Sequence, residues 1–158
     1  MSPVARIALV VVVLGLAVAL GYLWRARNGR FTPVDPGVLA AAGVDPAHDE
    51  TATARLASDD LGAPLGSRAT FLQLSSEVCT PCRRTHAVLA AIAAERNDVS
   101  HVDLDVAVHL DLVRRFDVMR TPTILLLDGS GAVVGRLSGA TDRRQALDAL
   151  DAGCPVIA

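Results

Sequence analysis

An apolar run near the N-terminus constrains this chain more than any other feature. Ile7 to Trp24 is an 18-residue stretch without a charged side chain. As an α-helix it would span roughly 27 Å, close to the hydrocarbon thickness of a bilayer. Tyr22 and Trp24 end the run, where amphipathic rings favour the membrane interface, and Arg25 follows directly. We therefore expect residues 1–24 to form a transmembrane anchor with a single span.

A cleaved signal peptide is the alternative for the same run. Its cleavage site would be Ala17-Val18-Ala19, but apolar sequence continues beyond that point. Arg6 and the α-amine precede the span, and Arg25, Arg27 and Arg30 follow it. By the positive-inside rule, a margin of about one charge favours a cytoplasmic C-terminal part. We expect an uncleaved single-pass protein of the cell membrane, and this count leaves the side of the C-terminal part open.

Composition excludes several classes of protein. The 158 residues carry a formal net charge of −2 and are 51% hydrophobic, so we expect neither disorder nor a nucleic-acid partner. Three cysteines are too few for a disulfide-stapled mini-protein. Scattered glycines and prolines over residues 25–54 indicate a linker or lead-in segment.

Periodicity from about Arg68 onward predicts an α/β domain with a mixed central sheet and helices on both faces. A strand–helix–strand unit requires a parallel pair, and Asp128-Gly129-Ser130-Gly131 has the composition of a hairpin turn. Residues 52–65 are expected to add an N-terminal strand or hairpin. The expected strands cover residues 70–74, 101–106, 123–127 and 133–137, and the expected helices follow Pro81 to about Arg96, cover 108–116, and cover 142–150 with Asp142 in the first turn.

Cys79-Thr80-Pro81-Cys82 lies between a predicted strand and the start of a predicted helix. Pro81 suits the first helical turn, where its missing N–H group has no partner to lose. Unpaired N–H groups and the helix dipole stabilise a thiolate at this position. We therefore expect Cys79 to attack a substrate disulfide and Cys82 to resolve the mixed disulfide.

A zinc site is the alternative for the cysteine pair, because C-x-x-C is half of many zinc sites. His86, four residues after Cys82, and His101, His109 and Cys154 could complete four ligands. They include no second closely spaced pair, and the intervening Thr-Pro suits a helix entry better than a zinc knuckle. We expect no metal and no cofactor, and we interpret His86 and His109 as surface residues and Cys154 as an apolar filler.

Two motifs at a fixed separation carry a family resemblance. One runs from Gln73 through Cys79 and Cys82 to Arg83, and the other is Arg120-Thr121-Pro122-Thr123, with Pro122 forty residues after Cys82. With Gly129 and Gly131 in the hairpin and Gly139 before the last helix, the stretch from about Arg68 to Leu150 resembles the thioredoxin family. The resemblance implies a thioredoxin-like domain over residues 55–152, a tail over 153–158, and protein thiols and disulfides as partners.

The resemblance also implies roles for the second motif. Pro122 would be preceded by a cis peptide bond, which costs little before proline. It would lie against the cysteine pair and leave the backbone of Thr121 free to pair with an extended substrate chain.

The sequence departs from the family pattern around the cysteines. Thioredoxins usually carry a buried Asp six residues before the first cysteine, and this chain has Gln73 there, which cannot titrate. Val78 replaces the usual Trp, and His101 stands where a lysine often pairs with the buried acid. Proton transfer at Cys82 therefore has to use water or another group, and Glu77 is a nearby candidate.

The function expected from these residues is that of a membrane-tethered thiol–disulfide oxidoreductase. The dipeptide between the cysteines lacks the histidine associated with oxidising family members, which favours a reductant or an exchange catalyst of intermediate potential. One alternative is a dedicated thiol reductant in cytochrome c maturation. Another is a non-catalytic thioredoxin-fold adaptor for a membrane partner, which the cysteine pair argues against and Gln73 modestly favours.

Overall fold

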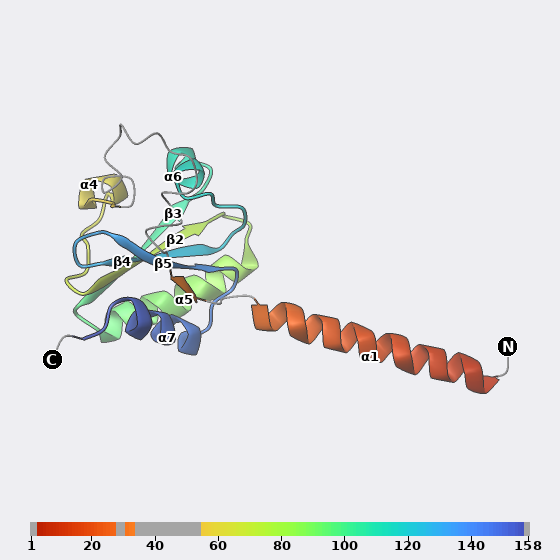
Figure 1. Ribbon diagram of the computed structural model, residues 1–158. Helices are drawn as coiled ribbons and strands as arrows, with labels where there is room; N and C mark the ends of the chain where they lie inside the picture. Colours follow the sequence, from red (N-terminus) through yellow and green to blue (C-terminus); the bar gives the residue numbers. More distant parts are fainter. Residues whose placement is uncertain (1–2, 28–30, 34–54, 157–158) are drawn as a thin grey trace, which may run out of the picture.

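A five-stranded sheet organises the C-terminal part of the computed structural model, which describes residues 3–27, 31–33 and 55–156 (Figure 1). The strand order is β1-β5-β4-β2-β3. β2 and β3 are parallel, whereas β2–β4, β4–β5 and β1–β5 are antiparallel, so the predicted mixed sheet is confirmed. The strands are β1 (Phe31–Pro33), β2 (Ala69–Ser75), β3 (Val99–Asp105), β4 (Thr123–Asp128) and β5 (Val133–Ser138).

Helices cover both faces of the sheet. α5 (Thr80–Glu95) and α7 (Arg143–Gly153) pack on one face, and α4 (Ser58–Leu61) and α6 (Leu110–Arg115) lie on the other (Figure 1). Alternate residues of β2 serve the two faces, because successive strand side chains point in opposite directions. Ala69 and Phe71 belong to the core under α5 and α7, and Leu72 and Leu74 to the core on the opposite face.

The start of α7 differs from the prediction by one position. Asp142 precedes the helix as its N-cap residue instead of lying in the first turn. Its carboxylate accepts a hydrogen bond from the Gln145 N–H group (2.9 Å), and the Gln145 side chain accepts one from the Asp142 N–H group (2.9 Å). This reciprocal capping box satisfies two donors that the helix cannot satisfy internally.

The strand or hairpin expected over residues 52–65 is wrong for the part of it that the structure describes. Arg55 makes one isolated bridge to Ala132, and the short helix α4 follows. Leu56 and Leu61 are nevertheless buried in the core on the α4 and α6 face. The apolar residues of this stretch therefore enter the core from a loop and a single helical turn, and residues 52–54 lie outside the described residues.

Pairing at the sheet edge begins earlier than the sequence suggested. Phe31, within the predicted lead-in segment, pairs with Leu137 of β5, and Pro33 pairs with Gly135. The Phe31 ring packs over Gly135, where a Cβ atom would overlap it. Proline is tolerated on an edge strand because it has no N–H group to leave unpaired there.

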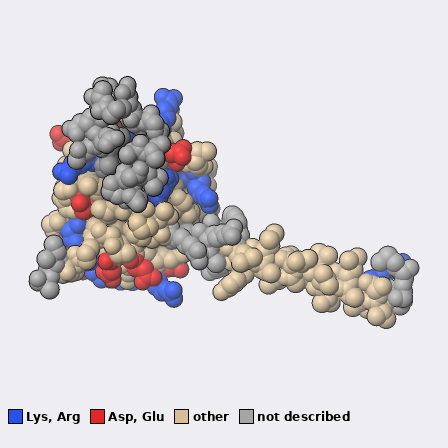
Figure 2. All heavy atoms as spheres, in the orientation of Figure 1, with Lys and Arg blue, Asp and Glu red and all other residues tan. Residues whose placement is uncertain are grey.

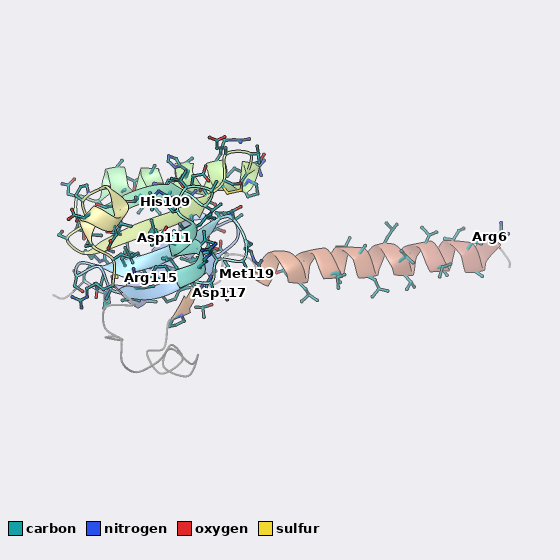
Figure 3. All side chains as sticks on the ribbon, turned by 90° about the horizontal axis from the view of Figure 1, so that it is seen from above. Arg6, His109, Asp111, Arg115, Asp117 and Met119 are labelled. Atoms are coloured by element: carbon teal, nitrogen blue, oxygen red, sulfur yellow. A yellow bond between two sulfur atoms is a disulfide. The ribbon has the colours of Figure 1, made fainter. Side chains whose placement is uncertain are left out.

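α1 (Pro3–Arg27) projects away from the sheet (Figure 1). Residues Val4–Leu23 have a mean hydropathy of 2.6, and none of that window is buried. Figure 2 shows its surface as uncharged along most of its length, with basic colour near the free end, where Figure 3 labels Arg6. α1 is thus long and apolar enough to cross a membrane or to act as a signal sequence.

Candidate active site

Two loops that carry the predicted site residues lie at the same end of the sheet, where β2 ends and β4 begins. Leu74, near the end of β2, pairs with Thr123, the first residue of β4. The chain after β2 leads to Cys79, and the chain before β4 contains Pro122. β3 also ends here, because Ser75 pairs with Asp105. Antiparallel pairing of β2 and β4 therefore brings the cysteine motif and the proline motif, which are distant in the sequence, to one end of the sheet.

Cys79 and Cys82 form a disulfide with an S–S distance of 2.07 Å. Cys79 is the N-cap residue of α5, and its sulfur accepts a hydrogen bond from the Cys82 N–H group (3.1 Å). Thr80 and Pro81 occupy the first turn of α5 and are exposed. Cys79 is half-buried, whereas Cys82 is only 3% exposed. A thiolate at Cys79 would receive the dipole and N–H groups of the helix start and would be the more accessible of the two.

The loop before β4 contains the cis bond that the resemblance implied. The Thr121–Pro122 peptide is cis, which confirms that prediction. The Pro122 carbonyl oxygen accepts a hydrogen bond from the Gly139 N–H group (2.8 Å), and the Thr123 hydroxyl donates one to the Arg120 carbonyl oxygen (2.8 Å). These bonds hold the loop on both sides of Pro122.

Gln73 is fully buried beneath the cysteine pair. Its side-chain amide donates to the Ser75 hydroxyl oxygen (2.6 Å) and to the Cys82 carbonyl oxygen (3.1 Å), and lies 3.4 Å from Asp103 Oδ2. Its Oε1 atom is buried without a hydrogen-bond partner among the described residues. The position aligned with the family's buried acid is therefore buried here too, but it holds a neutral donor.

An open cleft of about 630 Å³ lies beside Cys82. On its wall, His86 Nδ1 on α5 lies 2.8 Å from Asp103 Oδ2 on β3. Burial, together with repulsion from His86, lowers the pKa of the neighbouring His101 to about 4. The cleft is lined by Ser75, Ser76, Glu77, Cys82, Arg83, His86, Asp103 and Asp105.

Glu77 was predicted from the sequence as a proton-transfer candidate, whereas Asp103 was not. Glu77 lines the cleft, and its backbone carbonyl oxygen accepts a hydrogen bond from Arg83 (3.4 Å). His86, interpreted above as a surface residue, is exposed, but it also pairs with Asp103 at the cleft. Two sequence signals were available. His86 lies one helical turn after Cys82. His101 and Asp103 are two positions apart in a strand, so their side chains point to the same face.

Cys154 lies in the core formed with α5 and α7 and is 6% exposed. Its thiol lies 3.8 Å from the Leu127 carbonyl oxygen. Burial raises the pKa of this thiol, which disfavours the reactive thiolate. Across residues 3–27, 31–33 and 55–156, no three His, Cys, Asp or Glu side chains gather in a way that could hold a metal ion.

Exposed apolar side chains flank both loops of the site. Val78, directly before Cys79, is 89% exposed, and Met119, on the segment that leads to Pro122, is 82% exposed. The fold and site together define a class of protein: a thiol–disulfide exchange domain with a redox pair at a helix N-terminus.

Comparisons with known proteins agree with that class. A sequence model of the thioredoxin family matches residues 64–152. A curated thioredoxin from Mycolicibacterium smegmatis is 31% identical over 111 residues, covering 65% of this chain and 98% of that protein. A solved thioredoxin from Nicotiana alata aligns with 27% identity and a TM-score of 0.50, covering 56% of this chain and 75% of that one. A mutant thioredoxin from Halobacterium salinarum, 18% identical over 58% of this chain and 80% of that one, shares the fold with a TM-score of 0.52.

The chain belongs to the thioredoxin family. Its Cys79–Cys82 pair is the active-site pair of a thiol–disulfide oxidoreductase. Its partners, as for this fold in general, are protein thiols and disulfides.

Proposed function

We propose that this protein is a membrane-tethered thiol–disulfide oxidoreductase that exchanges its Cys79–Cys82 disulfide or dithiol with protein substrates close to the membrane surface. The observation that best supports the exchange reaction is the difference in exposure between the two cysteines. Cys79 caps α5 and is accessible, whereas Cys82 is buried behind it. The two cysteines are therefore suited to different steps.

In the reducing direction, the Cys79 thiolate attacks one sulfur of a substrate disulfide. A Cys79–substrate disulfide forms, the substrate's own S–S bond breaks, and one substrate thiolate leaves. Cys82 then attacks Cys79, so that the internal disulfide forms and the second substrate sulfur leaves as a thiolate. Two electrons pass from the dithiol to the substrate. The reverse sequence oxidises a substrate dithiol.

The Thr121–Pro122 loop is proposed to hold the substrate chain during these steps. Thr121 lies two positions before the first residue of β4, and within the described part of the chain it makes no backbone hydrogen bond. An extended substrate segment can pair with such a backbone as an added strand. Exposed Val78, directly before Cys79, and exposed Met119, three positions before Pro122, are proposed to supply apolar contacts to the substrate.

The register of β1 supports a location of the site near the membrane. Phe31 pairs with Leu137, Leu137 with Ile124, and Ile124 with Gln73. The chain therefore enters the sheet close to the end that carries the active site. Only residues 28–30 separate α1 from β1, and four Cα–Cα steps of about 3.8 Å span at most about 15 Å. With α1 in the bilayer, the end of the sheet that carries the active site would lie near the membrane surface.

Trapping of mixed disulfides tests the roles of the two cysteines. Full-length Cys82→Ser, expressed in its native membrane, should accumulate disulfide-linked partners through Cys79, and Cys79→Ser should accumulate none. A Cys154→Ala background leaves the active-site pair as the source of any adduct. Equal trapping by both variants would overturn the assignment. Partner binding that survives removal of both cysteines would instead support the adaptor function.

Carbonate extraction of native membranes tests the tether. The full-length chain should remain in the pellet, since an apolar helix long enough to span the bilayer resists extraction. Recovery of a shorter soluble form would show that the apolar run is removed as a signal peptide. Protease protection in sealed vesicles then establishes the side of the domain. Equilibration of the cysteine pair with glutathione, followed by thiol trapping, measures its potential and shows whether it is a reductant.

A further inference from the structure

We propose that His86, oriented by Asp103, accepts the proton of the Cys82 thiol when Cys82 resolves the mixed disulfide. This inference depends on the resolving role of Cys82 proposed above. It identifies the group that takes over proton transfer in a site whose residue 73 cannot titrate.

Helix geometry places His86 on the same side of α5 as Cys82. The two residues are four positions apart, which puts their side chains on adjacent turns of one face. Both line the open cleft of about 630 Å³. A cleft of this size admits water, so a proton can pass from the buried sulfur to the imidazole through a water molecule.

Asp103 determines which nitrogen of His86 is free to accept a proton. Its Oδ2 atom lies 2.8 Å from His86 Nδ1. An ionised carboxylate only accepts hydrogen bonds, so Nδ1 carries the hydrogen and Nε2 is the basic atom. The carboxylate also stabilises the imidazolium that forms after the transfer, as in other His–carboxylate pairs.

Gln73 connects this pair to the reactive cysteine. Its amide nitrogen lies 3.1 Å from the Cys82 carbonyl oxygen and 3.4 Å from Asp103 Oδ2. It therefore spans the gap between the first turn of α5 and the carboxylate on β3. Because it stays neutral, it fixes the geometry without competing for the proton.

Charged side chains line the cleft on which His86 lies. Asp103 and Asp105 from β3 and Glu77 from the preceding loop line the cleft, opposed by Arg83 on α5. His101 packs edge-on against His86, with ring centroids 4.9 Å apart, and burial keeps it neutral by lowering its pKa to about 4. Of the groups on the cleft, an imidazole suits proton exchange with a thiol near neutral pH better than an ionised carboxylate does.

The resolving step balances as follows. The Cys82 S–H proton passes through water to His86 Nε2, and the sulfur's electron pair forms the Cys82–Cys79 bond. The Cys79–substrate S–S bond breaks, and the substrate sulfur leaves with that bond's electron pair. The imidazolium later returns its proton to water or to the released thiolate.

Stopped-flow reaction of the reduced full-length protein with the aromatic disulfide 5,5′-dithiobis(2-nitrobenzoate) tests the proposal in detergent micelles. Cys79 releases the first aromatic thiolate, and Cys82 releases the second in the resolving step. All variants carry Cys154→Ala. At about pH 7, His86→Ala should slow the second release by about 10²-fold and shift its pH profile toward the titration of a free thiol. Added imidazole should restore the rate, and Asp103→Asn should give a smaller loss with the same shift.

His109→Ala is the matched control, since His109 is a partly exposed histidine that does not line the cleft. A second release with the same rate and profile in His86→Ala and wild type would overturn the proposal. A slower release that keeps the wild-type profile and is not restored by imidazole would show a structural role and would also overturn it. Failure of Cys82→Ser to stop the second release would contradict the resolving role itself.

Discussion

The side-chain amide of Gln73 donates a hydrogen bond to the carbonyl oxygen of Cys82 over 3.1 Å. This bond ties the centre of β2 to the first turn of α5 at the buried cysteine. The same amide also donates to Ser75. Position 73 therefore needs a donor, whereas an ionised carboxylate only accepts hydrogen bonds.

Gln73→Asp should make the protein less stable and its resolving step faster near neutral pH. The shorter carboxylate loses the bonds to Ser75 and Cys82 and lies near the Asp103 carboxylate, at a cost of about 1–3 kcal/mol. Burial raises the pKa of a carboxyl, so it could take the Cys82 proton directly. Denaturant unfolding and the second thiolate release measure the two effects. Gln73→Asn is the neutral control of equal size, and an Asp variant with unchanged stability and rate would contradict this view of position 73.

Acidification should destabilise the fold through His101, whose pKa burial lowers to about 4. An unfolded histidine titrates near 6.5, so between about pH 6.5 and 4 the unfolded chain binds a proton that the folded chain does not. Stability is then complete above this window and is lost through it as pH falls, by on the order of 2 kcal/mol. His101→Gln should flatten the slope between about pH 6.5 and 4.

Circular dichroism suits the His101 measurement, because the only Trp and Tyr, Trp24 and Tyr22, lie in α1. Asp128 affects a separate range. Burial alone would raise its pKa, but hydrogen bonds from Ser130 and Ala132 outweigh that and hold it below its ordinary value. Its contribution is therefore lost at a lower pH than that of His101. An unaltered slope in His101→Gln would show that another group causes the acid sensitivity.

Gly135→Val should release β1 from the sheet. A side chain at Gly135 overlaps the Phe31 ring, so the edge strand has to move away. Phe31→Ala removes part of the same contact and should cost about 1–3 kcal/mol in unfolding free energy. Hydrogen exchange at β1 should become fast in Gly135→Val, whereas exchange in β2 should stay slow. Protection of β1 in both variants would contradict the packing.

Cys154 should be chemically silent in the folded protein. It is 6% exposed, and burial raises the pKa of its thiol. Iodoacetamide should label reduced Cys79 rapidly and Cys154 only as fast as the domain unfolds. Mass spectrometry of timed samples separates the two sites, and labelling in denaturant provides the reference. Rapid labelling of Cys154 under native conditions would show that the C-terminal end of the core opens locally.

The parts of the fold that the sequence predicted are those with a local signal. Alternation over residues 101–106 identified β3, and helical spacing after Pro81 identified α5. The cis bond at Pro122 came from the family resemblance and not from spacing. β1 has only three residues, too few for a period to be recognised, and its pairing depends on β5.

The site was predicted less completely than the fold. Motifs located Cys79 and Cys82, but no motif contains His86 and Asp103, which are 17 positions apart. Their contact depends on the rotation of α5 over β3, which sequence spacing does not determine. Glu77 was predicted because it is close to Cys79 in the sequence. Asp103 is distant in the sequence, and only the packing of α5 on β3 brings it next to His86.

The short connection between α1 and β1 also bears on how often the cysteines meet a partner. With α1 in a bilayer, as proposed, Phe31 would lie within about 15 Å of the helix end, and the domain would search a thin layer instead of the whole compartment. Confinement of this kind raises the effective concentration of partners anchored in the same layer, without any new contact. Partners that diffuse freely receive no such gain. Pairing of Phe31 with Leu137 fixes the start of the domain close to α1. Among equally reactive disulfides, those anchored in the same membrane layer would therefore react more often than those in free solution.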